Sequence, residues 1–129
     1  MNEGKIHYAI GYLPQLTDCP STRLLEDRYG FIVLSDECYS EIYTREAPGS
    51  LLAVAGNDFA NVVAFQSLSK RSNLAGYRCA FVAGDADVVG ELLAVRKNLG
   101  LQMPGPQQRA MIAALDDDAH ARDQHATYA

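Results

Sequence analysis

Cysteine, positive charge and long apolar runs are all scarce in this chain of 129 residues. The three cysteines are odd in number and form no Cys-x-x-Cys pair, so neither a disulfide framework nor a zinc site is indicated. The 11 basic side chains are outnumbered by 16 acidic ones, and the resulting charge of -5 argues against binding to nucleic acid or to an anionic membrane. A small molecule or a protein is the expected partner.

The apolar runs are also too short for a membrane span. The longest, Phe31–Leu34 and Val62–Phe65, fall far below the roughly 20 residues that a bilayer requires, and no signal peptide is evident. With 48% apolar residues the chain can build one compact core. We therefore expect one soluble, cytoplasmic domain.

The same two runs predict a pair of buried strands. They are rich in branched residues, and Ser50 can cap a short helix between them that ends near Gly56. Residues 31–35 and 62–66 are therefore expected to be adjacent parallel strands. Residues 77–83 follow too soon for another crossover, so this segment should return antiparallel on the far side of the second strand. This is an α/β pattern.

Three further helices are expected around these strands. Residues 22–29 end at Gly30, and Asp85 can cap a helix that Gly100 terminates. Pro106 can start another helix. The apolar residues expected on one side of the last two helices are Val88, Val89, Leu92, Leu93 and Leu99, and Met111, Ile112 and Leu115.

Two polar clusters stand where this topology would place a ligand. The sequence Asp36-Glu37-Cys38-Tyr39 follows the first strand, and Ser67-Leu68-Ser69-Lys70 follows the second, with Arg78 beyond it. Ligands of parallel sheets bind beyond the carboxyl ends of the strands. A lone lysine there is most simply a surface charge, but the joint spacing of the clusters is rare.

The motifs SDECY and SLSKRSNLAGYR resemble those of class I/II aminotransferases with the aspartate aminotransferase fold. The resemblance implies an α/β three-layer sandwich, the large domain of the type I fold of pyridoxal-phosphate-dependent transferases. Residues 22–129 would form part of that domain, and residues 1–21 are left unassigned.

The resemblance also implies roles for individual residues in binding pyridoxal 5'-phosphate. Lys70 would bind the cofactor covalently and move a proton at the substrate, because its amine is both a nucleophile and a base. Asp36 would pair with the pyridine nitrogen, and Tyr39 would donate a hydrogen bond to the ring hydroxyl. The phosphate would be held by Ser67, Ser69 and Arg78.

The substrate is less clearly indicated than the cofactor. The strings SDECYSEIY, SLSKRSNLAG and FVAGDA look most like N-succinyldiaminopimelate aminotransferases of bacterial lysine biosynthesis. An aminotransferase for aspartate or aromatic substrates and a non-catalytic remnant remain alternatives. Two departures touch the site: Ala75 and Ala80 stand where the family usually has proline and glycine, and the methyl of Ala80 could crowd the phosphate loop.

Two other groups of residues have simpler interpretations. His120 and His125 lie near three aspartates, but their five-residue spacing puts them on different helix faces, so a solvated acidic helix start is favoured over a metal site. Cys38 and Cys79 are interpreted as packing residues.

Family members are much longer than this chain and are expected to act as homodimers on amino-acid and 2-oxo-acid substrates. We find no counterpart of the arginine that grips the substrate carboxylate. A truncated piece of the large domain, without turnover by itself, is therefore expected.

Overall fold

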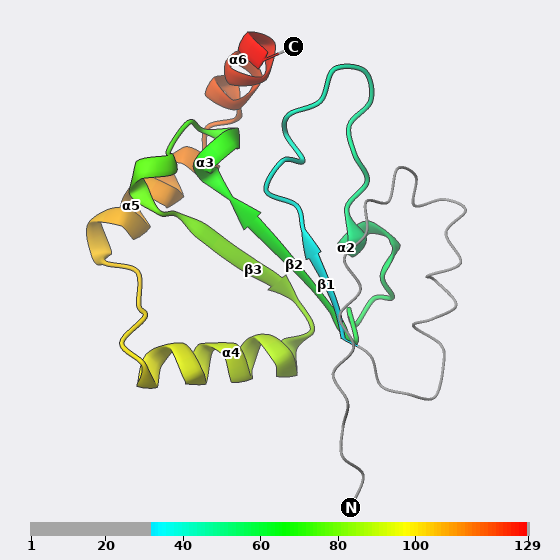
Figure 1. Cartoon of the computed structure of the whole chain (residues 1–129), viewed down its shortest axis with the longest axis vertical. Helices are drawn as coiled ribbons and strands as arrows, with labels where there is room; N and C mark the ends of the chain where they lie inside the picture. The colour runs from blue at the N-terminus through cyan, green and yellow to red at the C-terminus, as the bar shows by residue number, and fades with distance from the viewer. Residues whose placement is uncertain (1–31, 129) are drawn as a thin grey trace, which may run out of the picture.

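The computed structural model describes residues 32–128, whose central feature is a three-stranded sheet in the order β1-β2-β3 (Figure 1). β1 (Val33–Asp36) and β2 (Val62–Ser67) run parallel. β3 (Ala80–Gly84) runs antiparallel along the other side of β2. The parallel pair and the antiparallel return are thus confirmed, while the expected helix at 22–29 lies outside the described residues. The expected burial of the first strand is wrong: Ile32 and Leu34 are 50% and 60% exposed, because β1 lies at the edge of the described sheet.

The third strand begins later than its apolar sequence predicts. Ala75–Tyr77 forms a 3-10 turn, labelled η2, and Arg78 then adopts a left-handed conformation with φ 56°. Left-handed backbone cannot continue a strand, so pairing starts only at Ala80. The expectation that the strand begins at residue 77 is therefore wrong, and Arg78 lies on the turn that precedes β3.

Strand β2 lies at the centre of the core. Val62, Val63 and Ala64 are almost fully buried although successive side chains point to opposite faces of the sheet. Leu68 and Cys79 are buried beside them, which agrees with a packing role for this cysteine. Full burial of a valine or leucine side chain contributes about 1.5–3 kcal/mol.

Side-chain caps begin two of the helices, as the sequence predicts. Ser50 accepts a hydrogen bond from the backbone N–H two residues later at the start of α2 (Leu51–Val54). Asp85 accepts from the N–H groups two and three residues later at the start of α4 (Ala86–Asn98). Left-handed Gly100 follows α4 with φ 68°, the conformation typical of a helix stop.

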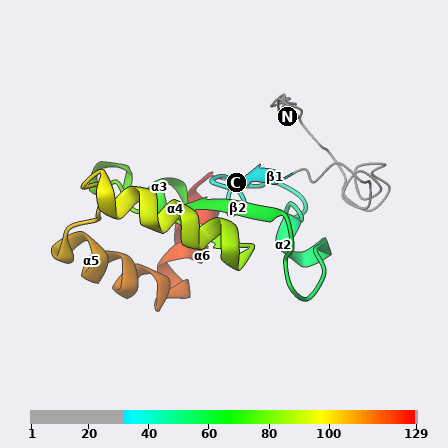
Figure 2. The same cartoon turned by 90° about the horizontal axis from the view of Figure 1, so that it is seen from below.

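The described helices lie on one side of the sheet and beyond the carboxyl end of β2 (Figure 1 and Figure 2). In Figure 2, α2 and α5 (Gly105–Leu115) lie on the same side of the strands. In Figure 1, α6 (Asp118–Tyr128) lies beyond the carboxyl end of β2, next to α3 (Leu68–Arg71). The α/β fold class is confirmed, and these elements supply the sheet and one helical layer of the sandwich.

The apolar sides of α4 and α5 are largely exposed. No residue of either helix is buried, and the exposed fraction reaches 52% at Val95 in α4 and 58% at Ile112 in α5. The sequence pattern predicted these apolar sides, but residues 32–128 cover them only in part, at half-buried Val88, Val89 and Met111. No helix in this part of the chain has the length and apolarity needed to cross a membrane.

Candidate functional site

The carboxyl ends of β1 and β2 bring the two polar motifs to one edge of the sheet. Asp36 is the last residue of β1, and Ser67 is the last residue of β2. Asp36 is paired with Phe65, two residues before Ser67. Paired residues of parallel strands, and residues two apart on one strand, point to the same face. Asp36 and Ser67 therefore share one face of the sheet.

Asp36 is held as a carboxylate by the turn that follows it. Its Oδ1 accepts a hydrogen bond from the backbone N–H of Cys38 at 3.1 Å. Hydrogen bonding from the Cys38 thiol, and then from this N–H, lowers the pKa of Asp36 below its usual value. Because the side chain is exposed, it is accessible to a ligand. An ionised carboxylate at this position is suited to pair with a protonated ring nitrogen.

Cys38 is correspondingly unreactive. Burial, followed by the hydrogen bond and the charge of Asp36, raises the pKa of the Cys38 thiol to about 11. A thiol with this pKa is almost entirely protonated at neutral pH, so it is a poor nucleophile. This agrees with its interpretation as a packing residue.

Lys70 and Tyr39 connect the two motifs in space. Lys70 lies on α3, which Ser67 caps by accepting a hydrogen bond from the Ser69 N–H at 3.1 Å. The Lys70 Nζ stands over the Tyr39 ring, 5.5 Å from its centroid, although the two residues come from different strand ends. An ammonium over an aromatic face at this distance is an attractive cation–π contact.

The three residues expected to hold a phosphate are only partly brought together. The Ser67 and Ser69 hydroxyls are 2.9 Å apart and form a hydrogen bond. Arg78 is exposed, and its Nη1 donates to the Ala75 carbonyl at 3.1 Å. Among the described residues no hydrogen bond joins Arg78 to either serine. Ala80 pairs with Ser67 across the β2–β3 ladder, next to this group.

Sequence reasoning assigned no role to Glu37, which the structure shows to be a buried link. Its exposed fraction is 7%, and both carboxylate oxygens have donors. Oε1 accepts from the Leu51 N–H at the start of α2, and Oε2 accepts from the Gln66 side chain, each at 2.8 Å. The only signal in the sequence is its place after Asp36, which turns it to the opposite face of the sheet.

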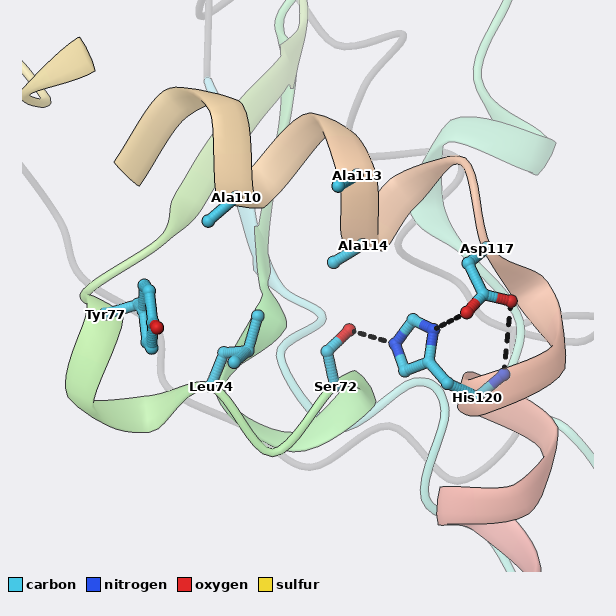
Figure 3. A pocket seen from close by; sticks show the side chains of 8 residues that line it. All are labelled: Ser72, Leu74, Tyr77, Ala110, Ala113, Ala114, Asp117 and His120. Atoms are coloured by element: carbon cyan, nitrogen blue, oxygen red, sulfur yellow. Dashed lines mark hydrogen bonds and ion pairs between the residues drawn. The ribbon is translucent and has the colours of Figure 1, made fainter. Parts of the chain in front are cut away.

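An open pocket of about 350 Å³ lies beside α3 rather than at the strand ends (Figure 3). In Figure 3 the Ser72 hydroxyl points to His120 Nε2 at 2.8 Å, and His120 Nδ1 faces Asp117 at 3.2 Å. None of the predicted cofactor residues lines it. The lining residues are Ser72, Leu74, Tyr77, Ala110, Ala113, Ala114, Asp117 and His120.

Asp117 and the two histidines make hydrogen bonds within the fold. Asp117 accepts hydrogen bonds from the N–H groups two and three residues later, so it caps α6 as the acidic helix start predicts. These bonds and the nearby His120 side chain lower the Asp117 pKa. His125 instead meets the Tyr43 carbonyl at 2.7 Å. Residues 32–128 contain no cluster of three or more possible metal ligands.

Comparison with known proteins identifies the family. The sequence profile described as "Aminotransferase class I and II" matches residues 19–129. The chain therefore belongs to the class I and II aminotransferases, whose members use pyridoxal phosphate. A solved aminotransferase from Neisseria meningitidis is similar, with 46% identity and a TM-score of 0.73 over 81% of this chain and 28% of that one.

Three curated relatives are similar to this chain, and two of them are named for different substrates. A probable aminotransferase of Mycobacterium tuberculosis is 52% identical over 102 residues, or 78% of this chain and 24% of the relative. The 4-dedimethylamino-4-oxo-anhydrotetracycline transaminase OxyQ of Streptomyces rimosus is 49% identical, with 78% and 28% covered. The LL-diaminopimelate aminotransferase of Aquifex aeolicus is 41% identical, with 68% and 23% covered. The chain thus spans about a quarter of these relatives.

The side chains at the strand ends fit the cofactor of the family. They provide an amine, a carboxylate with a lowered pKa, a phenol, two adjacent hydroxyls and a guanidinium. These are suitable groups for an aldehyde, a pyridine nitrogen, a ring hydroxyl and a phosphate. The type I fold of pyridoxal-phosphate enzymes is shown by the structural match.

Proposed function

We propose that this chain is the cofactor-anchoring part of an aminotransferase that moves an amino group between an amino-acid derivative and a 2-oxo acid. The observation that carries the proposal is the contact of Lys70 with Tyr39 at the carboxyl edge of β1 and β2. The contact brings together Lys70, the proposed covalent anchor, and the Tyr39 phenol, which lies 31 residues earlier in the other motif.

Lys70 is proposed to hold pyridoxal phosphate through Nζ and, when freed, to carry a proton to and from the substrate α carbon. The cofactor supplies an electron sink for that carbon. The carboxylate of Asp36 would keep the ring nitrogen protonated, and its lowered pKa supports this because the group stays ionised at neutral pH. The Tyr39 hydroxyl would donate to the ring oxygen.

Ser67, Ser69 and Arg78 are proposed to hold the phosphate. The two hydroxyls are already adjacent, and each can turn its proton toward an anion. The guanidinium of Arg78 uses Nη1 for Ala75, which leaves further N–H groups without a partner among residues 32–128. Phosphate would add the charge-assisted hydrogen bonds that arginine forms well.

For the amino donor we propose N-succinyldiaminopimelate, as in bacterial lysine biosynthesis. The strings SDECYSEIY and FVAGDA support it, and the similarity to LL-diaminopimelate aminotransferases supports a diaminopimelate-type substrate. The greater identity to OxyQ supports a different substrate class as the alternative. We further propose a cytoplasmic protein whose full-length form is a homodimer acting on small molecules.

Covalent capture of pyridoxal phosphate tests the cofactor assignment. The chain has three lysines, so Lys97, on the exposed surface of α4, provides the control. We expect the purified chain to develop a visible absorption band with pyridoxal phosphate, and borohydride to fix the label on the Lys70 peptide. Lys70→Ala should abolish this label and Lys97→Ala should retain it. Equal labelling of the Lys70→Ala variant would overturn the proposal.

Turnover is a separate question, because the substrate must also be held with its α hydrogen perpendicular to the cofactor ring. We expect no amino transfer by this chain alone from N-succinyldiaminopimelate or glutamate to a 2-oxo acid. Mass spectrometry of the reaction mixture measures the transfer. Transfer above the Lys70→Ala background would show that the chain is a self-sufficient enzyme. The substrate assignment itself is tested by comparing these two donors with a full-length relative.

A further inference from the structure

The helix that carries Lys70 depends on its neighbours for its shape. α3 has only four residues, Leu68–Arg71, and a helix of one turn is not stable in isolation. Its first residue, Leu68, is buried in the core, and Ser67 caps the start of the helix. What fixes its carboxyl end is the side chain of Arg71, the residue directly after Lys70.

Arg71 contacts three separate elements from a nearly buried position. Its side chain is 13% exposed. Nη1 donates to the Ala114 carbonyl at 2.8 Å in the last turn of α5, and Nη2 pairs with Asp118 at 2.5 Å at the start of α6. Nε lies 3.4 Å from Glu41, in the loop that follows Tyr39. The Arg71 guanidinium therefore connects α3 to the loop after Tyr39, to α5 and to α6.

The helix geometry turns these contacts into a constraint on Lys70. Successive side chains of a helix are about 100° apart, so Lys70 and Arg71 leave α3 in different directions. Arg71 points to α5 and α6, while Lys70 points to Tyr39. Any rotation of α3 that moved the lysine amine would have to break the contacts of Arg71.

We propose that Arg71 is a positioning residue for Lys70, acting by locking the rotation of α3 against Glu41, Ala114 and Asp118. The role rests on the proposed function of Lys70 as the cofactor-binding residue. It requires Arg71 itself, because lysine keeps the charge but cannot reach three acceptors in the fixed planar arrangement of a guanidinium.

The Ser72–His120–Asp117 chain in Figure 3 is a second connection between the same elements. Its order is that of a hydrolytic triad, but the N–H groups of Ser72 and Leu74 both donate to the Leu68 carbonyl. They are therefore not available to stabilise an oxyanion, which such chemistry needs. These three side chains instead connect the end of α3 to α6, which adds to the contacts of Arg71.

The position of Lys70 can be measured without the cofactor. Reductive ¹³C-methylation of the lysines leaves their charge in place, and the Tyr39 ring current should displace the Lys70 methyl signal in an NMR spectrum. Loss of the signal in Lys70→Arg assigns it. We expect Arg71→Gln to move this signal to the position of the exposed Lys97, and Arg71→Lys to move it part of the way.

Arg122→Gln is the matched control, since it removes the same charge from an exposed side chain on α6. It should leave the Lys70 signal unchanged. Urea unfolding of each variant establishes that it is folded under the conditions of the NMR experiment. If Arg71→Gln does not fold, Arg71→Lys and Asp118→Asn carry the test. A folded Arg71 variant whose Lys70 signal stays at the wild-type position would overturn the proposal.

The rate of pyridoxal phosphate capture provides the link to function. Misplacement of a reacting group by about 1 Å costs on the order of a hundredfold in rate, so capture per folded Arg71→Gln molecule should slow by about tenfold to a hundredfold. The Arg122→Gln rate should stay within about twofold of wild type. Wild type that fails to label Lys70 would overturn the proposed function. Wild-type labelling with an unchanged rate in Arg71→Gln would overturn only the role of Arg71.

Discussion

Replacement of Gly84 by alanine provides a sharp test of the sheet geometry. Gly84 ends β3 with φ 142°, a backbone conformation that L side chains rarely adopt. A Cβ added here would lie 2.0 Å from the Val62 carbonyl oxygen and 2.9 Å from the Val63 Cα. Both are backbone atoms of the central strand, so no side-chain rotation can relieve the overlap.

The expected cost has two parts. Forcing alanine into such a conformation costs about 1–3 kcal/mol. Displacement of the Val62 carbonyl would also break the hydrogen bond that it accepts from the Asp85 N–H at 2.8 Å, which costs about 1–3 kcal/mol for a buried group. We therefore expect Gly84→Ala to lower the free energy of unfolding by about 2–6 kcal/mol.

Gly90→Ala is the matched control. Gly90 lies inside α4 with no atom within 4 Å of an added Cβ, so alanine should raise the free energy of unfolding by about 0.5–1 kcal/mol. Urea unfolding followed by circular dichroism measures both variants. If Gly84→Ala unfolds at the same urea concentration as wild type, the close approach of β3 to β2 described above is wrong.

Three further perturbations follow from the structure. The pKa of Cys38 is raised from 9.0 to about 11, so iodoacetamide should alkylate it about a hundredfold more slowly at neutral pH than an ordinary thiol. Peptide mass spectrometry measures this rate, and the rate of an ordinary thiol would contradict the prediction. Glu37→Ala should lower the free energy of unfolding by about 1–3 kcal/mol in urea unfolding, whereas exposed Glu46→Ala should have no measurable effect; equal effects would refute the buried link. The pKa of Asp85 is lowered, mainly because the Asn61 N–H donates a hydrogen bond to its carboxylate. The ionised carboxylate therefore stabilises the folded protein above the unfolded pKa of 3.8, and this stabilisation is lost as the pH falls through the folded pKa. Thermal unfolding between pH 2 and neutral pH should therefore show a smaller acid-induced loss for Asp85→Asn, and parallel curves would exclude the effect.

Much of this protein could be predicted from local sequence signals. The apolar runs at 31–34 and 62–65 both predict strands correctly, but only the second strand is buried as a continuous apolar run implies, since Leu34 in the first is 60% exposed. Ser50 and Asp85 predict helix starts because their side chains satisfy N–H groups only two or three residues away. The two polar motifs were also evident, since Asp36 ends β1 and Lys70 follows the end of β2 by three residues.

Tertiary structure decided the features that depend on distant contacts. Arg71 reaches Ala114 and Asp118, which are 43 and 47 residues away, so no local pattern could identify its acceptors. Glu37 follows a motif aspartate in the sequence, yet it is buried because Leu51 and Gln66 supply donors from other elements. Arg78 was expected on a strand, but the turn before it sets a left-handed conformation. Apolar periodicity predicts which side of α4 is apolar, whereas only the packing around it determines whether that side is covered.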